Sequence, residues 1–177
     1  MSLHPKSNII CSLSLPNFFA TNSILLNGFF MFKKFLIIHR LIFRKYSILR
    51  IMQILELEKF ELKGSILDVG SKKSPSNVSN HIKYNKDITY LDKYSNDPND
   101  IKIDLEEKYL GNLDIKFDNI VLFNVLEHIY KFHNCINTCN SFLKKDGLFI
   151  GSTPFIFQIH GSPNDYFRFT SETLNII

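Results

Sequence analysis

The chain has 177 residues, 45% of them hydrophobic, which is enough material for one folded domain with an extension. Its net charge of +4 is unevenly distributed, because the first fifty residues hold seven Lys/Arg and no Asp or Glu, whereas the remainder holds 14 basic and 17 acidic residues. A nucleic-acid-binding core would carry a basic face on the domain itself, so this balance argues against nucleic acid as a partner.

The three cysteines do not provide a disulfide framework, because their number is odd. Cys135 and Cys139 lie one helical turn apart, and we interpret them as small buried residues of a helix rather than as a metal-binding pair. The sequence therefore predicts a reducing, cytoplasmic setting and no metal site.

Residues 1–30 are predicted to be an extension, either disordered or poorly packed. Residues 7–32 contain no charge but many polar side chains, which makes a poor membrane-spanning helix. A signal peptide would have its positive charge before the apolar part, and only Lys6 precedes it. One hypothesis is that the natural chain starts at Met31.

Residues 31–61 form a second predicted segment, in which apolar residues recur every three or four positions over 31–57 with basic residues between them. Two interpretations fit this basic amphipathic helix. We favour a helix that packs one face on the domain. The alternative is a helix that lies on an anionic membrane, which would place the protein peripherally at the inner face of the membrane.

Residues 62–177 are predicted to be the main domain, with strands alternating with helical connections. The expected elements are strands ending at Gly70, at Asp92 and at Asp104, a central strand over 117–123, a helix over 124–143 closed by Gly147, a strand over 148–153, and a final helix capped by Thr170 or Ser171. The absence of hairpin signals predicts an α/β fold with a parallel sheet and right-handed crossovers.

Carboxylates follow three of these strands, at Asp68, Asp92 and Asp104. Asp92 lies 24 residues after Asp68, a spacing at which nucleoside-binding sheets hold ribose hydroxyls. The loop after the first strand has Lys72 and Ser74 where a dinucleotide-binding loop would have further glycines. Close backbone approach to a pyrophosphate is therefore not favoured, which argues against a nicotinamide-dependent oxidoreductase.

Five motifs in this order resemble class I S-adenosylmethionine-dependent methyltransferases of the type 11 group. They are residues 66–70, 91–92, 104–105, 117–121 with 124–128, and 142–149. The most specific part is Leu126-Glu127-His128 after an apolar strand. The segment 153–170 is similar to a subgroup met among bacterial cell-surface polysaccharide genes. The resemblance implies a Rossmann-like parallel sheet that lacks the last strands of the class I methyltransferase fold, behind an N-terminal helical extension.

The resemblance also implies a cofactor, S-adenosylmethionine, and roles for individual residues. Asp68 and Gly70 would contact its methionine part and Asp92 its ribose. Asp104 and the backbone of Leu105 would meet the adenine, and Asn124 would line the cofactor pocket.

Two histidines are the candidate catalytic bases, because a sulfonium methyl donor is already activated and the protein has only to align the reactants and remove a proton. They are His128 and His160, although His128 could instead bond locally at the start of a helix. Asp165, Tyr166 and Arg168 are expected to bind the acceptor. The alternative for Arg168 is a salt bridge to Asp165.

The predicted activity is methyl transfer to a small-molecule or glycan-like acceptor in cell-surface polysaccharide biosynthesis. An alternative is a non-catalytic remnant or nucleoside-binding module, because the chain stops before the antiparallel pair of strands that completes such sheets. That loss is expected to leave one sheet edge unpaired.

Overall fold

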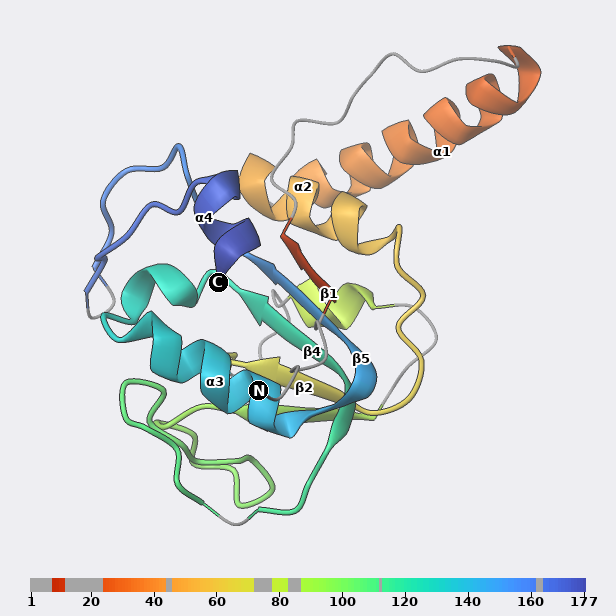
Figure 1. Ribbon diagram of the computed structural model, residues 1–177. Coiled ribbons are helices and arrows are strands. Elements are labelled where there is room, and N and C mark those ends of the chain that lie inside the picture. The colour runs from red at the N-terminus through yellow and green to blue at the C-terminus, as the bar shows by residue number, and fades with distance from the viewer. Residues whose placement is uncertain are drawn as a thin grey trace.

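A computed structural model describes residues 8–11, 24–43, 46–71, 78–82, 87–111, 113–161 and 164–177. Within these residues five parallel strands form one sheet in the order β1-β5-β4-β2-β3 (Figure 1). The strands are β1 (Asn8–Cys11), β2 (Ile66–Val69), β3 (Ile88–Leu91), β4 (Phe117–Phe123) and β5 (Leu143–Ser152). The predicted Rossmann-like α/β fold with a parallel sheet is confirmed. Lys72 and Ser74, which occupy the positions where a dinucleotide-binding loop would have further glycines, lie outside the described residues.

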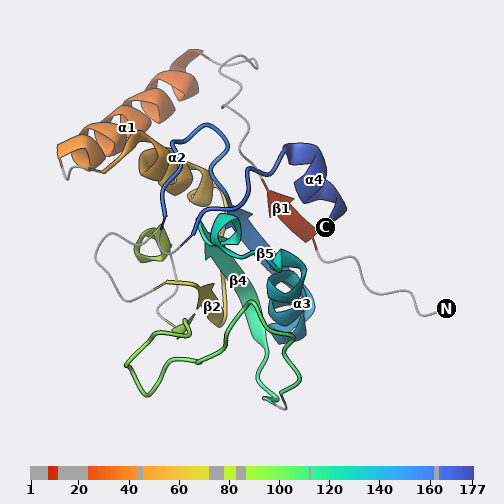
Figure 2. The ribbon, with the colours of Figure 1, turned by 90° about the vertical axis from the view of Figure 1, so that its left-hand side faces the viewer.

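Helices cover both faces of this sheet, as Figure 2 shows with the sheet seen close to edge-on. On one face, α3 (Phe132–Phe142) and α4 (Ser171–Ile176) pack on side chains such as Leu67 and Ile120. On the other, α2 (Ile48–Leu57) and the 3-10 helix η1 (Val78–His81) cover Ile66 and Val121. Both faces are buried, which explains why β2 and β4 are nearly continuous apolar runs.

The two cysteines of the main domain lie in α3, where Cys135 and Cys139 are both buried and free. Their interpretation as small core residues of a helix is confirmed. Thr170 caps α4, as predicted, by accepting a hydrogen bond from the Thr173 backbone N–H at 3.2 Å.

The N-terminal part differs from its predicted boundaries. Helix α1 (Ile24–Phe43) begins before Met31, and Ser47 caps α2 through a 3.3 Å bond from the Arg50 backbone N–H, so the region 31–57 holds two helices. Strand β1 pairs in parallel with β5 and covers the sheet edge that we expected to be unpaired. This pairing supplies ladder partners along one side of β5, from Leu148 to Gly151.

The end of the predicted helix over 124–143 is also different. A short 3-10 helix, η2 (Leu126–His128), precedes α3, and β5 then starts at Leu143. Phe117 pairs with Leu143 and Asn119 with Leu148, so four residues of β5 bulge opposite Asp118. Gly147 therefore lies inside a strand and does not cap a helix. Lys144 stabilises this bulge, because its Nζ lies 2.9 Å from the Asp118 carboxylate.

The third predicted strand is reduced to a single bridge between Leu91 and Ile101. Among the described residues, no helix is both long and apolar enough to cross a membrane.

Candidate functional site

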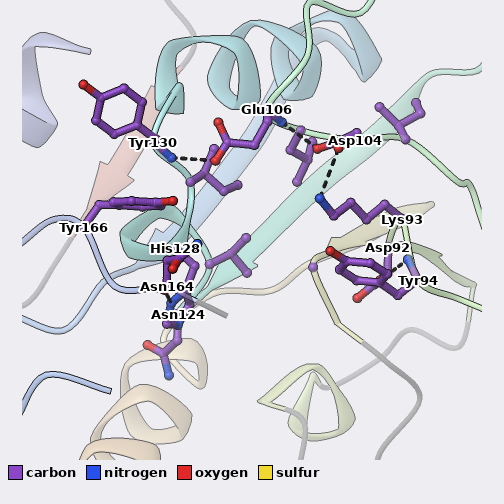
Figure 3. A pocket seen from close by; sticks show the side chains of 15 residues that line it. Asp92, Lys93, Tyr94, Asp104, Glu106, Asn124, His128, Tyr130, Asn164 and Tyr166 are labelled. Atoms are coloured by element: carbon purple, nitrogen blue, oxygen red, sulfur yellow. Dashed lines mark hydrogen bonds and ion pairs between the residues drawn. The ribbon is translucent and has the colours of Figure 1, made fainter. Parts of the chain in front are cut away.

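A pocket of about 1050 Å³ opens where β2, β3 and β4 end (Figure 3). Parallel strands present their carboxyl ends at one edge of a sheet, which is where open α/β sheets bind ligands. The residues that line the pocket are Gly70, Asp92, Lys93, Tyr94, Ile103, Asp104, Leu105, Glu106, Asn124, Val125, His128, Ile129, Tyr130, Asn164 and Tyr166.

Gly70 forms the turn that follows β2. Its φ is +70°, and its backbone N–H donates to the Leu91 carbonyl at 2.7 Å. A Cβ at this position would lie 2.5 Å from Cγ2 of Val125, which also lines the pocket. Glycine is therefore required both for the left-handed backbone and for the close approach of Val125, which lies just after β4.

Asp68 does not line the pocket but lies beneath it in β2. Its side chain is 1% exposed, and the hydroxyls of Ser71 and Ser79 lie near its carboxylate without forming a hydrogen bond of good geometry. Burial raises the pKa of Asp68 to about 6, because the charged form loses its hydration.

Asp92 and Asp104 lie at the pocket rim, and the carboxylate of each accepts a hydrogen bond from a nearby backbone N–H. Asp92 accepts a 2.7 Å hydrogen bond from the Tyr94 backbone N–H, and Lys93 lies 3.1 Å from Asp104. Asp104 also accepts from the Glu106 backbone N–H at 3.0 Å. Partial burial opposes ionisation of Asp104, but the Glu106 N–H and the Lys93 ammonium outweigh it and lower its pKa.

Asn124 directly follows β4 and has a positive φ of 56°, a conformation that Asn tolerates better than most residues. Its Oδ1 accepts a 2.6 Å hydrogen bond from Nε2 of Gln53, which also donates to Oγ of Ser152 at 2.7 Å. Gln53 is 4% exposed. A buried side chain of α2 thus holds a residue of the pocket wall.

Two tyrosines, Tyr130 and Tyr166, form the side of the pocket that lies across from Asp92 and Tyr94 (Figure 3). The rings of Tyr130 and Tyr166 meet edge to face, with centroids 5.4 Å apart. Glu106 fixes the start of this segment, because its carboxylate accepts a 2.7 Å hydrogen bond from the Tyr130 backbone N–H.

The two candidate bases lie together at the end of the pocket. The rings of His128 and His160 are 5.0 Å apart and nearly perpendicular, although only His128 lines the cavity. Asp165 accepts from the His160 backbone N–H at 2.9 Å and forms a two-point ion pair with the Arg168 guanidinium. Glu127 is fully buried beside His128, and this burial raises its pKa.

A family model described as a methyltransferase domain matches residues 40–174. The chain belongs to this methyltransferase family. No curated protein matches the chain. Among solved structures, coclaurine N-methyltransferase bound to N-methylheliamine and SAH aligns with a TM-score of 0.42 and 19% identity, over 56% of this chain. The match covers 34% of that protein, so the chain spans about a third of its length.

The family predicted from the sequence motifs is thus confirmed. Within this methyltransferase domain the pocket gathers seven of the predicted site residues. They are Gly70, Asp92, Asp104, Leu105, Asn124, His128 and Tyr166. Asp68, His160, Asp165 and Arg168 lie outside the lining. Arg168 is engaged by Asp165, as the alternative interpretation of the sequence had it.

Several residues that shape the pocket were not among the predicted site residues. Gln53 could have been noticed as a polar residue on the buried face of α2, next to Ile54 and near Leu57. Nothing in the local sequence predicts that Lys93 pairs with Asp104 or that Glu106 holds Tyr130, because both contacts depend on how the loops fold over one another.

Proposed function

We propose that this domain binds S-adenosylmethionine and transfers its methyl group to a small, glycan-like acceptor. The observation that carries the proposal is the pocket of about 1050 Å³ at the strand ends, in a chain that belongs to a methyltransferase family. Ligand pockets usually measure about 300–1000 Å³, so this one has room for a nucleoside cofactor together with an acceptor.

The residues around Gly70 suit such a cofactor. Gly70 turns the chain in a left-handed conformation where β2 ends, and its backbone lines the pocket beside Val125. Asp92 offers a carboxylate to ribose hydroxyls, which can donate two hydrogen bonds to it. Asp104 and Leu105 would border the adenine, Asn124 would face the cofactor, and Asp68 would support the methionine end from beneath.

The cofactor supplies an activated methyl group when it is bound. The protein then has to hold the acceptor in line and remove its proton. His128 suits this task, because its Nδ1 is engaged by the Asn164 carbonyl and its Nε2 stays available as a base. His160 is the second candidate, 5.0 Å from the His128 ring.

The side of the pocket lined by Tyr130 and Tyr166 suits a sugar-like acceptor, such as one used in cell-surface polysaccharide synthesis. Tyr130 and Tyr166 offer aromatic rings on which the apolar face of a sugar ring can pack, and the Asn164 segment adds polar groups. Asp165 and Arg168 bond to each other beside His160, so we assign them to positioning this loop around the acceptor.

The experiment that tests the proposal is calorimetric titration of the full chain with S-adenosylhomocysteine. We expect micromolar, stoichiometric binding that is lost in Asp92→Ala and retained in Asp114→Ala, which changes an exposed residue outside the pocket. Absence of binding by the folded wild-type chain would refute the cofactor site. Binding without methyl transfer to any of a panel of sugars and nucleotide sugars would favour the nucleoside-binding module.

We further propose that α1 lies on an anionic membrane at its cytoplasmic face. Among the side chains of α1 that the structure describes, six large apolar ones are exposed, and α1 extends beyond the sheet with its C-terminal end near α2 (Figures 1 and 2). They are Met31, Phe32, Phe35, Leu36, Ile42 and Phe43. The basic residues interspersed with them in the sequence suit anionic headgroups.

Vesicle sedimentation tests this contact. We expect the chain to sediment with vesicles that contain phosphatidylserine and to lose this binding when Phe32, Phe35 and Phe43 are all changed to Ser. Ile156→Ser is the matched control, because Ile156 is 94% exposed elsewhere on the molecule. Equal sedimentation of the triple variant and the wild type would refute the proposal.

A further inference from the structure

Three side chains at the end of the pocket have the arrangement of a metal-binding site. Glu127, His128 and His160 each offer one ligand atom, and these atoms all lie within 4.8 Å of one another. Glu127 and His128 are adjacent in η2, and the fold brings His160 to them from the loop that follows β5.

Glu127 is the strongest indication that something is bound here. Its side chain is fully buried, and its Oε2 accepts a long 3.4 Å hydrogen bond from Thr153 Oγ1. Its Oε1 has no hydrogen-bond partner within the described residues and lies 3.7 Å from Nε2 of His128. A buried carboxylate oxygen without a partner is costly, so a cation at this position would satisfy it.

The two imidazoles are oriented as ligating histidines usually are. Nδ1 of His128 is engaged by the Asn164 carbonyl, and Nδ1 of His160 lies 3.2 Å from the Asp165 carboxylate. Asp165 is in turn fixed by Arg168. Oxygen acceptors at Nδ1 select the tautomer with its proton there and leave Nε2 of each ring as the free ligand atom, which is the outer-shell pattern of metal-bound histidines.

We propose that Glu127, His128 and His160 bind a divalent transition-metal ion, with Zn²⁺ the best match. Two imidazole nitrogens and one carboxylate oxygen favour Zn²⁺, Co²⁺ or Mn²⁺ over Mg²⁺ and Ca²⁺, which prefer oxygen ligands throughout. Three protein ligands leave a coordination position open.

The open position gives the ion a role in the site described above. Because His128 lines the pocket, the ion would stand at the pocket wall and could hold an oxygen of the acceptor. This role rests on the proposed methyl transfer, whereas ion binding itself does not. In the ion-loaded protein both Nε2 atoms are ligands, so the ion would replace the histidines as the group that activates the acceptor.

The test is titration of the chelator-treated full chain with Zn²⁺ by calorimetry, and with Co²⁺ by its visible absorption spectrum. We expect one ion per chain and at least about a tenfold loss of affinity in both Glu127→Gln and His160→Ala. His133→Ala is the matched control, because His133 is exposed and outside the cluster. The double variant Cys135→Ser/Cys139→Ser, which removes the two buried free thiols, should also bind normally.

Each outcome decides the proposal. His160 is partly exposed on a loop, so His160→Ala should stay folded, as circular dichroism will verify, even if Glu127→Gln does not. Absence of Zn²⁺ binding, or unchanged binding in folded His160→Ala, overturns the site. Titration with S-adenosylhomocysteine in the presence of chelator separates this result from the proposed function, because cofactor binding should persist without the ion.

Discussion

Gln53 donates a 2.6 Å hydrogen bond to Asn124 across 71 residues of sequence and thereby connects α2 to the pocket wall. The same Nε2 donates to Oγ of Ser152 at 2.7 Å, so one buried amide joins α2 to the ends of β4 and β5. The helix that precedes the sheet in the sequence is therefore part of the architecture that positions the candidate cofactor site.

Replacing Gln53 with Met, which conserves the shape but removes the amide, should weaken both stability and ligand binding. Ser152 is buried and would lose its donor, at a cost of about 1–3 kcal/mol in the free energy of unfolding. Asn124 would lose its orientation, and we expect S-adenosylhomocysteine to bind about three- to tenfold more weakly. Denaturant unfolding and calorimetry measure the two effects. Gln158→Met is the control, since Gln158 is exposed, and an equal effect of both variants would contradict the assignment.

Gly70→Ala should destabilise the fold for two separable reasons. A left-handed backbone costs an Ala residue about 1–2 kcal/mol. The new Cβ would also lie 2.5 Å from Cγ2 of Val125, and such overpacking adds about 1–3 kcal/mol. Adding Val125→Ala should recover the second part and leave the first. Urea unfolding of the wild type, both single variants and the double variant measures this as a cycle. Strictly additive effects would show that the Gly70 and Val125 side chains do not meet.

Asp68 should make the stability of the protein depend on pH. Burial raises the pKa of Asp68 from its ordinary value of 3.8 to about 6, so between these values the folded chain holds a proton that the unfolded chain has lost. Folded stability therefore falls as pH rises through this window, and the full penalty, up to about 2–3 kcal/mol, is reached above pH 6.

The variant Asp68→Asn removes this titration. Its stability relative to wild type should increase between pH 4 and pH 7, whatever constant offset the new amide introduces. Denaturant unfolding at several pH values measures the difference. The control is Asp114→Asn, because Asp114 is exposed. A difference that does not change with pH would show that Asp68 ionises normally in the folded chain.

The elements that could be predicted from the sequence are those whose signal is local. Continuous apolar runs identify β2 and β4 because both faces of the sheet are covered, and the break at Gly70 identifies the turn that lines the pocket. The start of β5 could not be predicted, since Lys144 to Gly147 has the composition of a helix end. In the structure this segment forms a bulge, and Asp118 on the neighbouring strand binds its Lys144.

The site residues also divide into those with a local sequence signal and those whose position depends on distant parts of the chain. Asp92 and Asn124 were predictable because each directly follows a strand whose end faces the pocket. The proximity of Glu127 to His160 was not, because it depends on how the loop after β5 folds back over η2. The role of Gln53 was not predictable either, since its partners Asn124 and Ser152 lie at two strand ends far away in the sequence.

Arg168 provides the last prediction, because its guanidinium is engaged by Asp165 rather than directed into the pocket. If Arg168 serves to neutralise the Asp165 carboxylate, Arg168→Met should lower the melting temperature more than the double variant Asp165→Asn/Arg168→Met does, because the single change leaves a charge unpaired. Thermal unfolding of the four proteins measures the coupling. If Arg168→Met instead leaves the melting temperature unchanged and raises the KM for the acceptor, then Arg168 binds the acceptor and its pairing with Asp165 is exchanged during binding.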